Sequence, residues 1–175
     1  MHDIPELVTP RLRLRGFQPH DFDAYATIMA EPEVTRYLGD GKPLTRVDAW
    51  RQLALFLGHW SLRGFGIWAV ELRATGELAG RIGLYEPEGW PGFEVGYTLG
   101  RQFWGHGYAR EGAGAAIGYA RETLGRTEIV SLIRPGNASS IRVAESLGAT
   151  LSGEIEFFGG PTLIYRYPPA REQRL

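Results

Sequence analysis

The chain reads Gln102-Phe103-Trp104-Gly105-His106-Gly107-Tyr108-Ala109 between a strand-like run, 93–99, and a helix-like run, 108–124. Two glycines with one residue between them let backbone N–H groups converge where no Cβ stands in the way. The positive end of a helix begins at the same point, and it favours an anion. The stretch therefore predicts a phosphate or pyrophosphate site at a strand-to-helix turn, although a tight turn without a ligand would show the same pattern.

Strand and helix patterns continue on both sides of this turn. Alternating or continuous apolar residues predict further strands at 11–17, 67–72, 78–85, 128–133, 150–157 and 163–167. Apolar residues at helical spacing, with capping or stop signals, predict helices at 21–30, after Thr45 and at 139–147. This order predicts an α+β protein with a mixed sheet rather than a long parallel sheet.

Length and composition narrow the class of protein. The 175 residues predict a single domain, 1–175, and 43% hydrophobic with 22% charged residues is typical of a globular protein. A formal net charge of −1 gives no reason to expect nucleic acid or a membrane as a partner. The absence of cysteine excludes disulfides and thiolate chemistry. We expect a cytoplasmic location, because the N-terminus lacks a signal pattern and no apolar run approaches about 18 residues.

Four segments resemble a known family. Residues 9–15 and 31–38 are similar to the opening strand and the first interhelical turn of RimJ/RimL-type enzymes, which acetylate the N-termini of ribosomal proteins. Residues 94–109 resemble the acyl-CoA strand and the Gln/Arg-x-x-Gly-x-Gly/Ala loop of the GNAT superfamily, and residues 137–148 resemble its Asn-x-x-Ser helix. Because these segments occur in order over most of the chain, it is identified as a GNAT N-acetyltransferase of the RimJ/RimL-type branch.

The resemblance implies a fold and a co-substrate. The fold is α+β, with a central mixed, mostly antiparallel sheet of about seven strands, flanked by helices and splayed at the acyl-CoA strand. The co-substrate is acetyl-CoA, whose pantetheine arm adds to residues 95–99 like a short strand. A backbone N–H near Leu99 would face the thioester carbonyl. The residues assigned to acetyl-CoA are Thr98, Leu99, Gln102, Gly105, His106, Gly107, Tyr108, Ala109, Arg110 and Asn137.

Within this set, the amides of residues 105–110 would hold the pyrophosphate, and Asn137 matches the position whose side-chain amide bonds the pantetheine. Arg101, His106 and Arg110 are the candidates for added positive charge. Other phosphate-binding loops match less well. The pattern Gly-x-x-x-x-Gly-Lys-Ser/Thr is absent, and Gly-x-Gly-x-x-Gly would need a glycine where the chain has Arg110.

Two residues are assigned to catalysis. An α-amino group has a pKa of about 8, so a modest base or a water relay is enough to obtain the neutral amine. The resemblance implies Glu94 as this base, with Glu154 and Glu156 as weaker alternatives. Many relatives carry a tyrosine as general acid where this chain has Ala144, so the resemblance implies Ser140 as the acid for the departing thiolate.

Aromatic residues divide into two groups. Trp60 and Trp68 are predicted to pack in the core, whereas Trp90 is predicted to wall the acceptor site. Trp50 and Tyr37 lie in the helical region that covers the acceptor pocket in relatives. The four histidines lack metal-ligand spacing, so no metal is expected.

The expected function is an acetyl-CoA-dependent N-acetyltransferase that moves an acetyl group to a primary amine by direct attack in a ternary complex. The acceptor is left open between a protein N-terminus and a small amine such as an amino acid, a polyamine or an antibiotic. Ser152 stands where the RimJ/RimL-type branch often has Glu, which weakens any transfer of that branch's specificity. A non-catalytic acyl-CoA sensor or interaction module is the alternative, and homodimer formation is left open.

Overall fold

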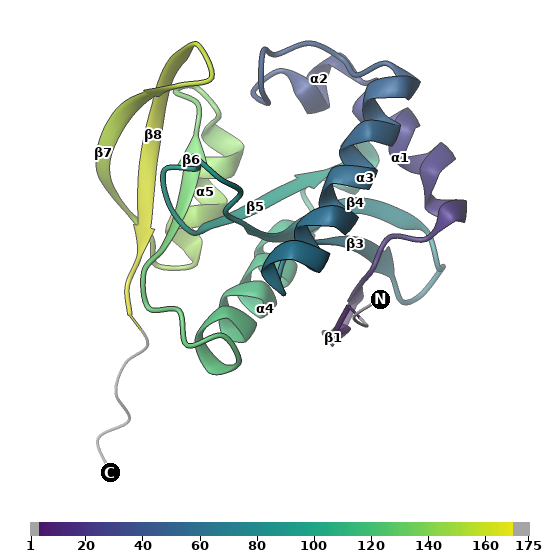
Figure 1. Ribbon diagram of the computed structural model, residues 1–175, viewed down its shortest axis with the longest axis horizontal. Coiled ribbons are helices and arrows are strands. Elements are labelled where there is room, and N and C mark those ends of the chain that lie inside the picture. Colours follow the sequence, from purple (N-terminus) through teal and green to yellow (C-terminus); the bar gives the residue numbers. More distant parts are fainter. Residues whose placement is uncertain (1–3, 170–175) are drawn as a thin grey trace.

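The computed structural model describes residues 4–169, and an eight-stranded sheet forms its centre (Figure 1). The strand order is β1-β2-β3-β4-β5-β6-β8-β7. All neighbouring strands are antiparallel except β5 and β6. The strands are β1 (Leu7–Val8), β2 (Leu12–Arg15), β3 (Ile67–Leu72), β4 (Leu78–Tyr85), β5 (Glu94–Leu99), β6 (Ile129–Ile133), β7 (Thr150–Phe157) and β8 (Gly160–Tyr167).

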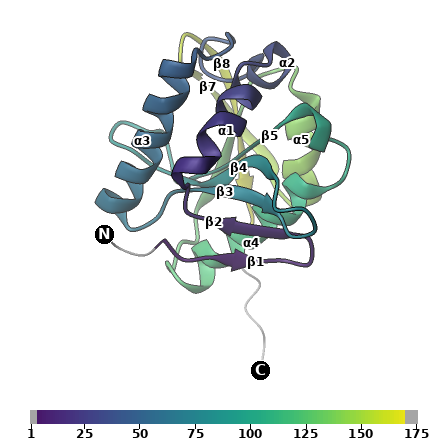
Figure 2. The same ribbon diagram turned by 90° about the vertical axis from the view of Figure 1, so that its right-hand side faces the viewer.

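Helices cover both faces of this sheet. α1 and α3 lie on one face and α4 on the other, while α5 packs beside α4 and β6 (Figure 2). The helices are α1 (Phe22–Met29), α2 (Pro32–Thr35), α3 (Arg46–Arg63), α4 (Tyr108–Glu122) and α5 (Ala138–Ser146), with 3₁₀ turns η1 (Pro19–Asp21) and η2 (Arg101–Phe103). Within residues 4–169, no helix has the length and the apolar content needed to cross a bilayer.

Alternation along β4 separates two hydrophobic cores. Ile82 is fully buried under α4, whereas Tyr85 packs into the core that α1 and α3 cover. Arg81 shares the face of Tyr85 because successive side chains of a strand point to opposite faces. Glu94 and Thr98 of β5 stand opposite Tyr85 and Arg81 in the register, so they lie on the same face. The predicted α+β class is confirmed.

Small residues let α4 approach the sheet. A Cβ added to Gly112 would lie 2.5 Å from Cδ1 of Ile82, and Ala113 and Ala116 are fully buried. Trp68 is also fully buried and Trp60 nearly so, as their predicted core positions require. The glycines therefore reduce helix propensity but remove the bulk that would hold α4 away from β4.

The sheet opens between β5 and β6. These two parallel strands share a single paired position, Glu94 with Val130, and they diverge beyond it. The η2 turn and the start of α4 follow β5 at this opening. The expectation of a mixed sheet splayed at the acyl-CoA strand is therefore confirmed.

Some element boundaries differ from the sequence prediction. The sheet has eight strands rather than about seven, because Leu7 and Val8 pair with β2 over a length too short to show alternation. β8 begins at Gly160 rather than at residue 163, since the hairpin turn with β7 is only two residues long. The prediction of a single domain covers residues 1–175, and the prediction about the N-terminus concerns its first residues. Residues 1–3 and 170–175 lie outside the described range.

Candidate active site

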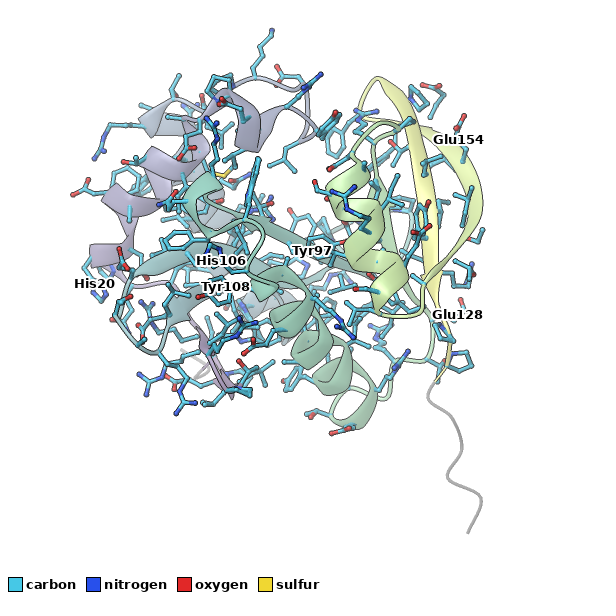
Figure 3. The ribbon with its side chains drawn as sticks, turned by 180° about the vertical axis from the view of Figure 1, so that it is seen from behind. His20, Tyr97, His106, Tyr108, Glu128 and Glu154 are labelled. Carbon is cyan, nitrogen blue, oxygen red and sulfur yellow. The ribbon has the colours of Figure 1, made fainter. Side chains whose placement is uncertain are left out.

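A cavity of about 650 Å³ lies at the opening between β5 and β6, and we call it the loop cavity. In Figure 3, Tyr108 lies at the N-terminal end of α4, and Tyr97 lies between that end and α5. The η2–α4 loop, the end of β5 and the start of α5 form its walls. The sequence-predicted residues that line it are Thr98, Leu99, Gly105, Gly107, Tyr108, Ala109, Arg110, Asn137 and Ser140.

The two loop glycines adopt a conformation that side chains disfavour. Gly105 has φ of 78° and Gly107 has φ of 80°, in the left-handed region. Gly107 is the N-cap of α4, and no side chain caps the helix there. The first N–H groups of α4 therefore lack a side-chain acceptor, which suits an anion such as a pyrophosphate.

The backbone of β5 offers further donors. The N–H of Gly100 donates to the carbonyl of Ala79 in β4 at 2.9 Å. Because hydrogen-bonded and non-hydrogen-bonded pairs alternate in an antiparallel ladder, the N–H groups of Tyr97 and Leu99 point away from β4 and toward the opening. The carbonyl of Leu99 points the same way and accepts from Nε1 of Trp104 at 2.8 Å.

Asn137 and Ser140 hold the opposite wall. Oδ1 of Asn137 caps α5, accepting from the N–H of Ser140 at 3.3 Å and from the hydroxyl of Ser139 at 3.0 Å. This cap leaves the NH₂ group of Asn137 as the donor available to a ligand. The hydroxyl of Tyr97 donates to the carbonyl of Ser140 at 2.8 Å, which ties α5 to β5. Burial raises the pKa of Tyr97, so its hydroxyl stays neutral.

A second cavity, of about 390 Å³, lies on the face of the sheet that α3 covers, and we call it the aromatic cavity. Trp90 lines it, edge-on to Tyr85 at 4.8 Å and to Phe157 at 4.9 Å between ring centroids. Phe56 and Phe158 add to the same walls. Trp90 therefore lines a cavity, and its role in an acceptor site stays a prediction.

Glu94 is the one carboxylate that lines the aromatic cavity within residues 4–169. Its Oε2 accepts from Nε1 of Trp90 at 2.8 Å. Burial raises the pKa of Glu94 to about 7, although the Trp90 N–H and the positive charge of Arg81 oppose this shift. A carboxyl group with this pKa can exchange a proton near neutral pH.

The two cavities meet. Thr98, Asn137 and Ser140 line both of them, together with Tyr37, Leu38 and Tyr97. Glu94 lines only the aromatic cavity, and the loop glycines line only the loop cavity. A ligand in each cavity would therefore contact the other at this shared boundary.

Some predicted residues lie elsewhere. Neither Gln102 nor His106 lines either cavity, and His106 is exposed, with Nδ1 2.8 Å from the carbonyl of Trp104. Arg101 pairs with Glu33 at 2.9 Å. Trp50 is 60% exposed and lines neither cavity. The glycine pattern located the turn correctly, but it carried no information on where the neighbouring side chains point.

Glu154 and Glu156, the alternative bases, are exposed on β7 at the edge of the sheet, and neither lines a cavity. Figure 3 shows Glu154 on this outer strand. Among the side chains within residues 4–169, no group of three His, Cys, Asp or Glu residues is arranged to hold a metal ion.

Four arginines of the site escaped the sequence prediction. Arg36 and Arg142 line the loop cavity, and Arg81 and Arg134 line the aromatic cavity. Arg142 follows Ser140 by two positions, so the predicted helix could have indicated it. The place of Arg81 depends on the register of β4 against β5, which no local pattern reveals.

Arg134 links two segments across the aromatic cavity. Its guanidinium donates to the carbonyl of Phe158, in the β7–β8 turn, at 2.7 Å. It also donates to the carbonyl of Gly39, in the loop between α2 and α3, at 3.2 Å. Arg134 therefore joins two walls that come from distant parts of the chain.

A model of the acetyltransferase (GNAT) domain matches residues 11–150 of the chain. The chain belongs to the GNAT acetyltransferase family. Membership confirms the sequence-based family prediction and gives the enzyme class, an acetyltransferase that uses acetyl-CoA and acts on nitrogen.

Relatives and solved structures agree with this GNAT membership. The chain is 32% identical to the uncharacterized protein YkkB of Bacillus subtilis, over 94% of this chain and 96% of YkkB. It is also 32% identical to the uncharacterized N-acetyltransferase p20 of Bacillus licheniformis, over 84% and 83% of the two chains.

An acetyltransferase structure from Agrobacterium tumefaciens superposes with a TM-score of 0.85 at 36% identity, over 95% of this chain and 96% of that one. The ribosomal-protein-S5-alanine acetyltransferase of Vibrio fischeri shares the GNAT fold, with a TM-score of 0.73 at 16% identity over 95% and 98% of the two chains. At that identity the likeness to a RimJ/RimL-type enzyme concerns the fold alone.

Proposed function

We propose that this protein transfers the acetyl group of acetyl-CoA to a primary amine by direct attack in a ternary complex. The observation that carries the proposal is the meeting of two cavities at Thr98, Asn137 and Ser140. The loop cavity offers the backbone donors and cations that an acyl-CoA needs. The aromatic cavity offers Glu94, a base for an amine. Both substrates can be bound at once, so no acetylated protein side chain is required.

Several groups would hold acetyl-CoA. The uncapped N–H groups at the start of α4 suit the pyrophosphate, and Arg110, Arg36 and Arg142 supply positive charge to the same cavity. The NH₂ group of Asn137 is a donor for a pantetheine carbonyl. Acetyl-CoA supplies an acetyl group activated as a thioester.

The residues on β5 and α5 then have distinct roles. Glu94 accepts the amine proton through a water molecule, so the nitrogen can form a bond to the acetyl carbon as the bond from carbon to sulfur breaks. The N–H groups of Tyr97 and Leu99 stabilise negative charge on the thioester oxygen. The hydroxyl of Ser140, at the boundary of both cavities, donates a proton to the leaving thiolate and takes one back from a water molecule, so the serine ends unchanged.

Release of CoA in the presence of an amine panel tests this function. The chain has no cysteine, so a thiol reagent reports only the CoA that forms. We expect CoA release that requires both an amine and the enzyme, with an N-acetyl product seen by mass spectrometry. Tight binding of acetyl-CoA without turnover of any amine would contradict the proposal and favour an acyl-CoA sensor.

The base is tested with Glu94→Gln. We expect about a 100-fold or greater fall in kcat at pH 8, because general base catalysis contributes roughly 10²–10⁴. The dissociation constant of acetyl-CoA, measured by calorimetry, should stay within about twofold, since Glu94 does not line the loop cavity. Glu154→Gln is the matched control, because Glu154 is exposed on β7. Full activity of Glu94→Gln across pH would show that another group is the base.

A further inference from the structure

Arg81 is a cation without a carboxylate partner in the aromatic cavity. It forms no ion pair with any carboxylate within residues 4–169, and its Nε is buried without a hydrogen-bond partner there. Its guanidinium lies over the ring of Phe56 at 5.2 Å. By contrast, the buried Arg15 contacts both Asp21 at 2.7 Å and Glu71 at 2.7 Å. Arg81 is half-buried, and Glu94, the one carboxylate that lines the cavity within residues 4–169, acts on its charge without contacting it, so an added carboxylate could form the direct pair that Arg81 lacks.

The floor of the aromatic cavity separates this cation from Glu94. Arg81 stands opposite Thr98, and Glu94 stands opposite Tyr85, on the same face of β4 and β5. Between the two pairs lies a pair of glycines, Gly83 and Gly96, and Gly96 lines the cavity. Four residues of strand separate Glu94 from Thr98, which is about 13 Å at ~3.3 Å per residue. The cavity therefore presents a negative group and a positive group on one face of the sheet, with Gly96 between them in the strand.

Gly96, in the middle of this floor, faces Glu94. A Cβ added to Gly96 would have the carboxylate of Glu94 as its nearest neighbour, with Oε1 at 3.7 Å. An amine above Gly96 would lie beside the proposed base and next to Thr98, where the two cavities meet. A carboxylate attached to the same molecule could then reach Arg81, across the strand from Thr98.

The remaining walls are apolar. Phe56, Trp90 and Phe157 line the cavity, and Tyr85 adds its ring from β4. Aromatic walls of this kind favour an apolar substituent. The volume of about 390 Å³ lies at the small end of the range for ligand pockets, about 300–1,000 Å³.

We propose that the acceptor is a free α-amino acid with an apolar side chain, held with its carboxylate on Arg81, its amine above Gly96 and its side chain against the aromatic walls. This inference rests on the proposed acetyl transfer and names its substrate class. A polyamine or an aminoglycoside would need several carboxylates, but the cavity has one, Glu94, and two arginines. A peptide N-terminus has an amide where the free amino acid has its carboxylate, and it would leave Arg81 without an anion.

Matched acceptors test the substrate class. CoA release is measured with phenylalanine, phenylalanine amide and phenethylamine, with leucine, leucine amide and the decarboxylated amine of leucine, and with spermidine. Each rate is corrected for the fraction of the acceptor that is neutral amine. We expect kcat/KM of the free acids to exceed that of the amides and the decarboxylated amines by about tenfold or more, because an arginine–carboxylate contact is a charge-assisted hydrogen bond. Equal rates for acid and decarboxylated amine, or a preference for the amide or for spermidine, would overturn the inference while acetyl transfer stands.

Variants assign the preference to Arg81. Arg81→Gln should reduce the ratio of kcat/KM for phenylalanine over phenethylamine toward one, mainly through KM for phenylalanine. The ratio cancels any effect of Arg81 on Glu94, which is common to both acceptors. Arg81→Lys should retain part of the preference, and Arg166→Gln, an exposed arginine that is paired with Glu128 and lines neither cavity, should leave it unchanged. A preference that survives Arg81→Gln would contradict the assignment.

Two readouts keep the two proposals separate. Melting temperatures report whether each variant folds. If Arg81→Gln does not fold, the comparison of acid with decarboxylated amine in the wild type and in Arg81→Lys still tests whether Arg81 binds the carboxylate. Calorimetric titration of phenylalanine and phenethylamine, with CoA present, measures the acceptor site without turnover. Absence of turnover for every amine would contradict acetyl transfer. Absence of a binding preference for the acid would contradict the role of Arg81.

Discussion

At the scale of single residues, the surroundings of Glu94, the proposed base, set its pKa. Burial raises this pKa to about 7, and the indole N–H of Trp90 is the main group that opposes the shift. The ionised carboxylate is the form that accepts a proton. We therefore expect kcat/KM, after correction for the neutral amine, to rise as the pH passes about 7 and to level above it.

Trp90→Phe tests this balance. The variant keeps an aromatic ring in the cavity wall but removes the donor that favours ionised Glu94, so the pKa of Glu94 rises further. The midpoint of the pH–rate profile should move to higher pH by about half a unit or more, and activity at pH 7 should fall. Trp104→Phe is the control, since Trp104 donates to Leu99 rather than to Glu94. An unchanged midpoint in Trp90→Phe would contradict the role of this hydrogen bond.

Several residue roles could be predicted from the sequence, and others could not. Glu94, Asn137 and the loop glycines line the two cavities, because motifs on one strand or one turn keep their spacing in the fold, and their roles stay predictions. Arg81 and Arg134 were missed, because the residues beside them in the fold lie more than 15 positions away in the sequence. Arg81 stands opposite Thr98, and Arg134 donates to the carbonyl of Phe158. A side chain whose partners are distant in sequence has no local pattern.

At the scale of elements, the turn from β5 into α4 is the part that the sequence predicted best. Strand alternation, two glycines and a helix pattern follow one another within about thirty residues. β1 was missed, since two residues cannot show a period of two. The helix after Thr45 was expected, and Thr45 does cap α3, with its side-chain oxygen accepting from the N–H of Asp48.

Gly107→Ala tests the function of the turn. The substitution forces a side chain into φ of 80° and places a Cβ 3.4 Å from Nη2 of Arg11, beside the first N–H groups of α4. We expect the dissociation constant of acetyl-CoA, measured by calorimetry, to increase about tenfold, because left-handed strain of about 1–2 kcal/mol shifts the loop away from the binding geometry.

Gly125→Ala is the matched control for this strain. Gly125 has φ of 65°, lies beyond the other end of α4 and has open space around its Cβ position. It should lower the melting temperature as Gly107→Ala does, yet leave acetyl-CoA binding unchanged. Equal loss of binding in both variants would mean that general destabilisation, rather than the loop, is responsible.

At the scale of the whole molecule, the aromatic cavity is built from segments that are far apart in the chain. Arg134 holds the α2–α3 loop at Gly39 and the β7–β8 turn at Phe158. Both segments belong to the walls of the aromatic cavity. The geometry of that cavity is therefore a property of the tertiary structure and not of a single motif.

Arg134→Met removes these hydrogen bonds and keeps part of the apolar stem. We expect KM for the acceptor to rise about fivefold or more, because two carbonyl partners lose a charge-assisted donor and the walls move apart. The dissociation constant of acetyl-CoA should not change. Amide hydrogen exchange should become faster in residues 36–44 and 157–162, and protection equal to that of the wild type in both segments would contradict the link.

The single paired position between β5 and β6 also has a consequence for folding cooperativity. Strands β1–β5 and strands β6–β8 are each continuous in their hydrogen bonding, but Glu94 and Val130 are the one paired position that joins them in the ladder. Such halves can open as separate units of local unfolding. A pantetheine chain bonded to the edge of β5 would add backbone-like hydrogen bonds at this weak seam. The co-substrate would then act as a missing strand, and it would make the two halves unfold as one.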